Sequence, residues 1–132
     1  MKLLVEEPGS DEATRVWTES ANRVSSLLLY PEACAAVAAA ARGGRIGRTT
    51  STRWRRTLER LWDEVEHSTL TIGLARRAGD LAELHGLRGY DAVHLASFER
   101  VADENVVLLT FDEDLRIAAR SLGLAVAPAI AL

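Results

Sequence analysis

Short apolar segments alternate with amphipathic segments along this chain. Runs of apolar, β-prone residues predict strands at 24–30, 69–72, 106–110 and 124–127. Between these runs, apolar residues recur three and four positions apart, which predicts helices. The expected helices span residues 10–19, 31–41, 52–67, 74–85, 91–102 and 112–122. Because strands alternate with helices, the pattern predicts an α/β fold with a mainly parallel sheet that is covered by helices.

Glycine and proline mark the ends of several predicted segments. Pro31 suits the first turn of a helix, where its missing N–H is not needed. Gly43, Gly86 and Gly123 each follow a predicted helix and are expected to end it. Residues 45–51 lie between two predicted helices and are expected to form a basic loop.

The composition narrows the class of protein. A length of 132 residues suits a single domain, and an apolar content of 48% is enough for a hydrophobic core. The sequence has no apolar run long enough to cross a membrane and no visible signal peptide, which predicts a cytoplasmic protein without a membrane partner. The single Cys34 has no partner for a disulfide, in agreement with that compartment.

The charge is unevenly distributed. A net charge of −3 argues against a general attraction to nucleic acid, yet residues 42–56 carry six arginines and no acid. A guanidinium binds phosphate through two parallel N–H groups, which makes this segment a candidate phosphate contact. A solvated helix face joined to a basic loop explains the same pattern equally well.

The segment 89–96, Gly-Tyr-Asp-Ala-Val-His-Leu-Ala, combines a helix start with one unusual acid. Gly89 allows a turn, and Val93, Leu95 and Ala96 belong to an apolar helix. Asp91 is therefore expected in the first turn of a helix whose other residues are mostly buried. One explanation is that its carboxylate stabilises the positive end of the helix. The other is that it belongs to a functional site.

Further acids follow the predicted strands. Glu32 comes just after the strand at 24–30, and Asp112 and Asp114 come just after the strand at 106–110. In parallel sheets, ligands bind beyond the carboxyl ends of the strands. The topology therefore places at least Glu32 and Asp112 at the same edge, although each of these acids also suits the start of a helix.

Carboxylates that are held together repel one another unless a cation lies between them. Oxygen ligands suit Mg²⁺ or Mn²⁺, which bind phosphate and activate water for hydrolysis. This is the chemistry of metal-dependent nucleases. His67, His85 and His94 do not have the spacing of a metal site, and we expect them to be structural.

Four segments together resemble the PIN-domain ribonucleases, in particular the toxins of VapBC-type toxin–antitoxin pairs. They are residues 2–10, 30–32 (Tyr-Pro-Glu), 89–96 and 109–112 (Leu-Thr-Phe-Asp), and they follow the family's order over essentially the whole chain. The resemblance implies an α/β/α sandwich and cleavage of RNA phosphodiester bonds with Mg²⁺ or Mn²⁺. It also implies a VapB-like antitoxin as a partner and frequent homodimers.

Carried over by position, the resemblance makes Asp91 the principal metal ligand. Glu32 and Asp112 would complete the acidic pocket, through waters or a second ion. Thr110 is expected as a hydrogen-bonding neighbour. Asp114 is a weaker candidate that suits a helix cap.

One family feature is absent from the sequence. Members of the family begin with a strand that ends in Asp, upstream of the equivalent of residues 2–4, whereas this chain starts at Met1. We expect that the natural start lies upstream and that residues 1–132 are a single, N-terminally truncated domain without its central strand. Read literally, the sequence predicts weak metal binding and low activity.

Two other functions are compatible with the sequence. A catalytically impaired PIN-like protein would bind antitoxin or RNA without cleaving RNA. A phosphoacceptor domain would also hold Mg²⁺ with acids, but no predicted strand ends in a candidate phosphoacceptor Asp, and Lys2 is the only lysine. In a toxin or an impaired relative, Arg45, Arg48 and Arg53 are expected to contact RNA or antitoxin.

Overall fold

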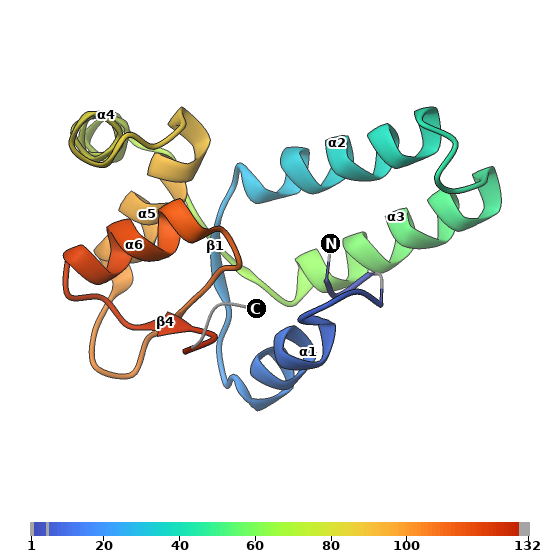
Figure 1. Cartoon of the computed structure of the whole chain (residues 1–132), viewed down its shortest axis with the longest axis horizontal. Coiled ribbons are helices and arrows are strands. Elements are labelled where there is room, and N and C mark those ends of the chain that lie inside the picture. The colour runs from blue at the N-terminus through green and yellow to red at the C-terminus, as the bar shows by residue number, and fades with distance from the viewer. Residues whose placement is uncertain (1, 5, 130–132) are drawn as a thin grey trace. The chain divides into compact units, whose positions relative to one another are not determined.

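Helices joined by short strands and loops make up the computed structural model, which describes residues 2–4 and 6–129 (Figure 1). The chain divides into two compact units, Met1–His67 and Ser68–Leu132. Across the described residues, no helix combines the length and the apolar character needed to span a membrane. Met1, to which the expectation of an upstream start refers, lies outside the described residues.

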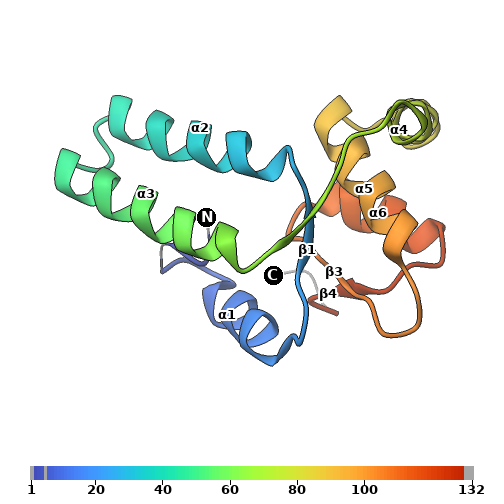
Figure 2. The ribbon, with the colours of Figure 1, turned by 180° about the vertical axis from the view of Figure 1, so that it is seen from behind.

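The first unit is built around a helical hairpin. Helices α2 and α3 lie side by side in both views of the ribbon (Figures 1 and 2). Alanines dominate α2 and allow close approach, and Val37, Ala40 and Leu58 are buried. Strands β1 and β2 pair with each other. The elements are α1 (Ser10–Glu19), β1 (Val24–Ser26), α2 (Leu29–Arg42), α3 (Arg48–Asp63) and β2 (Glu66–Ser68).

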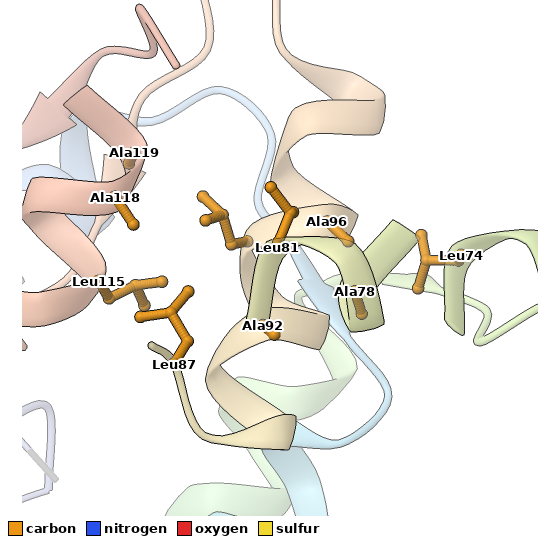
Figure 3. Close-up of a cluster of buried hydrophobic side chains, with 10 residues drawn as sticks. Leu74, Ala78, Leu81, Leu87, Ala92, Ala96, Leu115, Ala118 and Ala119 are labelled. Carbon is orange, nitrogen blue, oxygen red and sulfur yellow. The ribbon is translucent and has the colours of Figure 1, made fainter. Parts of the chain in front are cut away.

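The second unit packs three helices against a short parallel ladder. Leu108 of β3 lies opposite Val126 of β4. The core cluster draws buried leucines and alanines from α4, α5 and α6 (Figure 3). Its central member, Leu81, is fully buried. The elements are α4 (Ile72–His85), α5 (Gly89–Val101), β3 (Leu108–Leu109), α6 (Glu113–Ser121) and β4 (Val126–Ala127).

The expected fold class is confirmed, because the structure is a helix-rich α/β fold that contains parallel strands. The helix predictions are closest where a cap or a glycine defines the end. Gly86 ends α4 with φ of 64°, and Gly123 follows α6 with φ of 75°. Both are in the left-handed conformation, which glycine adopts without steric cost. In the part of the chain that the structure describes, the strands form two separate two-stranded ladders, β1–β2 and β3–β4. Strands β1, β3 and β4 are clearly shorter than the sequence predicts.

The prediction of a buried strand over 24–30 was wrong in its length and in its burial. The strand ends at Ser26, whose hydroxyl accepts a hydrogen bond from Leu28 N at 3.2 Å and turns the chain into α2. The helix therefore begins at Leu29, and Pro31 falls within its first turn. The side chains of Val24 and Leu27 are exposed.

Two other boundaries also differ from the sequence prediction. The strand expected at 69–72 lies at Glu66–Ser68 instead, because the Thr71 hydroxyl accepts a hydrogen bond from Leu74 N at 3.1 Å and starts α4 at Ile72. The expected basic loop 45–51 is shorter, since α3 already begins at Arg48.

The packing of α4 makes a testable prediction about stability. Leu81 is 0% exposed and Leu84, one turn further along the same helix, is 70% exposed. Leu81→Ala should lower the free energy of unfolding by about 2–5 kcal/mol through lost burial and a residual cavity. The exposed control Leu84→Ala should change it by about 0.5 kcal/mol or less. Urea denaturation of the two variants measures both, and equal losses would contradict this core.

Candidate active site

A pocket of about 340 Å³ opens where the starts of α5 and α6 come together in the second unit. Leu87, just before α5, and Leu115, in the first turn of α6, point toward each other in the core (Figure 3). Their packing brings the two helix starts together. The lining residues are Gly86, Leu87, Arg88, Asp91, Asp112 and Asp114.

Asp91 occupies the buried side of this pocket. It lies in the first turn of α5, a helix whose following residues Ala92, Leu95 and Ala96 are in the core. The residue is only 9% exposed. Its Oδ2 accepts a hydrogen bond from Arg88 Nε at 2.8 Å. A carboxylate so far removed from water needs a positive or hydrogen-bonding partner, and Arg88 supplies it.

The two carboxylate oxygens of Asp112 have different partners, a backbone N–H of α6 and the guanidinium of Arg88. It caps α6, since Oδ1 accepts a hydrogen bond from Leu115 N at 2.9 Å. Its Oδ2 lies 3.9 Å from Arg88 Nη2. The backbone N–H of Asp112 donates to the Thr110 hydroxyl at 3.2 Å, and Thr110 N donates to Ala127 O at 3.1 Å. Thr110 therefore links the position of Asp112 to β4.

Asp114 also lines the pocket, in the first turn of α6, but its side chain is exposed. The expectation that it caps the helix was wrong. Asp112 is the cap, because its oxygen reaches the N–H three residues ahead. Asp114 adds a third negative charge to the pocket, so that the acids outnumber Arg88.

Arg88 is a pocket residue that the sequence reasoning missed. It precedes α5 in an extended conformation, and its guanidinium lies over the Tyr90 ring at 4.7 Å from the centroid. The hydrogen bond from Arg88 to Asp91 raises the pKa of the guanidinium above its usual value, so Arg88 is charged throughout the physiological range. The spacing of three residues between Arg88 and Asp91, typical of helical ion pairs, was the available signal.

Arg116 is a second residue that the sequence did not identify. Although charged, it is 1% exposed. Its Nη1 donates to Thr110 O at 3.0 Å, and its Nη2 donates to Pro128 O at 2.6 Å. It thus ties α6 to the chain just beyond β3 and β4, next to Asp112.

The remaining sequence candidates belong to the first unit. Glu32 lies in the first turn of α2 and is half-buried. Arg45 lies in the loop before α3, Arg48 is the first residue of α3, and Arg53 follows on the same helix; all three are exposed. None of these arginines forms an ion pair with another residue that the structure describes. A role for them or for Glu32 in the site stays a prediction.

The donor set of the pocket fits a hard divalent cation. Asp91 and Asp112 present carboxylate oxygens, and both already attract a positive group, Arg88. Over residues 2–4 and 6–129, no three His, Cys, Asp or Glu side chains are grouped closely enough to hold a metal ion. Mg²⁺ commonly binds through one or two carboxylates and retains several waters, so a pair of acids is sufficient for it.

Fold and pocket together define an α/β protein with an acidic site at two helix starts. The PIN domain family model matches residues 1–121 of this sequence. The chain therefore belongs to the PIN domain family.

Relatives of known class cover nearly the whole chain. Ribonuclease VapC45 and Ribonuclease VapC49, from two strains of Mycobacterium tuberculosis, are each 40% identical over 129 residues, which is 98% of this chain and 90% of the relative. Ribonuclease VapC46 of Mycobacterium tuberculosis is 34% identical over 126 residues, or 96% of this chain and 88% of the relative. Within the PIN family, the chain is thus similar to VapC proteins.

The two roles of Asp112 can be separated by substitution. Asparagine caps helices about as well as aspartate, so Asp112→Asn should leave the free energy of unfolding within about 0.5 kcal/mol of the wild type. Asp112→Ala should lower it by about 1 kcal/mol, because the N–H of Leu115 loses its acceptor. Chemical denaturation measures the difference. Equal stability of the two variants would show that the cap contributes nothing.

Proposed function

We propose that this chain is a metal-dependent endoribonuclease and the toxin component of a type II toxin–antitoxin system. The observation that carries the proposal is the pairing of Asp91 and Asp112 in one pocket of a PIN-family chain. The similarity to proteins named Ribonuclease VapC supports the reaction and the class of substrate. The cofactor of the proposal is Mg²⁺ or Mn²⁺.

The proposed site assigns a task to each residue. Asp91, buried and held by α5, and Asp112, held by the α6 cap and by Thr110, provide carboxylate oxygens to the cation. When bound, such a cation activates water and stabilises the charge that develops on the phosphate. Asp114 adds negative charge at the exposed side of the pocket. Glu32 is proposed as a further carboxylate on the basis of the Tyr-Pro-Glu segment alone.

The proposed partners follow from the same relationship. RNA is the substrate, and a VapB-like antitoxin is the inhibitor, because the relatives are named VapC. The exposed Arg45, Arg48 and Arg53 carry positive charge near the start of α3 and are proposed to contact RNA phosphates or the antitoxin. A homodimer and a cytoplasmic location complete the proposal.

A catalytically impaired PIN-like protein is the second candidate. It would bind antitoxin or RNA without cleaving RNA. The observation that favours it is the position of Arg88, whose guanidinium lies between the two carboxylates that a cation would use.

The function can be tested with purified protein and a structured RNA that contains single-stranded loops. We expect cleavage with Mg²⁺ or Mn²⁺, loss of cleavage in EDTA, and recovery when the metal is restored. Asp91→Asn should reduce the rate by roughly 100-fold or more, because a neutral amide is a poor ligand for a hard cation. Asp80→Asn, which removes an exposed acid from α4, should cleave at the wild-type rate.

The outcome distinguishes the two candidate functions. RNA binding by the wild type with no metal-dependent cleavage would favour the impaired relative. Cleavage that is unaffected by both EDTA and Asp91→Asn would contradict the proposed site.

A further inference from the structure

Arg88 stands between the two carboxylates of the pocket. Its Nε donates to Asp91 Oδ2 at 2.8 Å, and its Nη2 lies 3.9 Å from Asp112 Oδ2. The two acids belong to the starts of different helices, so one guanidinium joins α5 to α6. The contact between the Arg88 guanidinium and the two carboxylates is an ion pair within the pocket. It places a single positive group beside the same oxygen atoms that the proposed function assigns to a divalent cation.

The two sides of this contact differ in their freedom to move. The Asp91 side chain is 13% exposed and is fixed by the buried helix α5, whereas the Arg88 side chain is 64% exposed. Arg88 precedes α5 and has an extended backbone, so its side chain can turn outward without disturbing the helix. Its guanidinium already lies over the exposed ring of Tyr90. That ring offers the displaced guanidinium a cation–π contact.

We propose that Arg88 is an exchangeable internal counter-ion, which holds Asp91 and Asp112 in the metal-free protein and is displaced when a divalent cation binds. This proposal rests on the proposed function, because it concerns the same pair of carboxylates. In this proposal Arg88 lowers the affinity for the metal, because the cation must compete with the Arg88 guanidinium for the same carboxylates.

The exchange follows from charge balance in a pocket with limited access to water. Without a cation, Asp91, Asp112 and Asp114 repel one another, and Arg88 reduces that repulsion. A divalent ion neutralises more negative charge than one guanidinium does. Removal of Arg88 should therefore lower the stability of the metal-free protein and raise its affinity for the metal. Both effects have the same cause, the loss of the positive group beside the two carboxylates.

The test is a titration of Mn²⁺ alone into the metal-free full-length protein, followed by calorimetry. Arg88→Gln should lower the dissociation constant for Mn²⁺ by roughly five- to tenfold, the effect of removing a charge-assisted contact that is partly exposed. Arg88→Lys keeps the charge but cannot donate from a planar fork to two acids, so it should give a smaller decrease.

Arg76→Gln is the matched control. Arg76 is an exposed arginine of α4 that forms no ion pair with any described residue. This variant removes the same charge from the same unit, so it reports the long-range effect of net charge. At physiological salt, screening over about 8 Å should leave its Mn²⁺ affinity close to that of the wild type.

Thermal unfolding in EDTA provides a readout that does not depend on bound metal. Arg88→Gln should unfold a few degrees below the wild type, and saturating Mn²⁺ should raise its midpoint by more than it raises that of the wild type. Arg76→Gln should behave as the wild type in both conditions. Circular dichroism establishes that each variant is folded, and Arg88→Lys carries the test if the glutamine variant is not.

The outcomes separate this proposal from the proposed function. If Arg88→Gln binds Mn²⁺ no more tightly than the wild type, the exchange is overturned, whether or not the wild type cleaves RNA. An equal gain in Arg76→Gln would overturn it as well, because net charge would then be the cause. If Arg88→Gln gains affinity but the wild type with saturating Mn²⁺ does not cleave RNA, the exchange stands and the proposed function fails.

Discussion

A carboxylate that is almost fully buried must have a positive or hydrogen-bonding partner, and Asp91 is such a carboxylate. It is 9% exposed because α5, the helix in whose first turn it lies, packs into the core of the second unit. The free energy of burying an unpaired charge is unfavourable enough that the surroundings must compensate for it. The hydrogen bond from Arg88 to Asp91 meets this constraint.

The geometry of the pocket depends on the apolar core beneath it. Leu87 and Leu115 pack together and bring the start of α6 to the start of α5 (Figure 3). Asp112 can then serve the fold and the site at once, with one oxygen on the N–H of Leu115 and the other toward Arg88. The alternatives that the sequence left open for Asp112, a helix cap or a site residue, are therefore compatible in one side chain.

Local signals explain which parts of the structure could be predicted. The glycine that ends α4 and the start of α6 after Asp112 each depend on a few neighbouring residues, and both agree with the sequence pattern. Helix α5 begins at Gly89, slightly before the expected position 91. The strands agree less well. The run 24–30 is apolar enough for a strand, but the Ser26 hydroxyl turns the chain after three strand residues. The hydrophobic pattern indicates that a segment is apolar, but it does not predict a turn that is set by one side-chain hydrogen bond.

The sequence by itself determined the α/β class, the order of the helices and the acids at the starts of α5 and α6, because these depend on spacing and capping along the chain. Only the tertiary structure decided that Arg88 joins Asp91 to Asp112, and that the charged Arg116 is buried with its guanidinium on the carbonyls of Thr110 and Pro128. Sequence patterns assign charged residues to the surface. The partners that allow an arginine to be buried, or to lie between two acids, come from segments that meet only when the core packs.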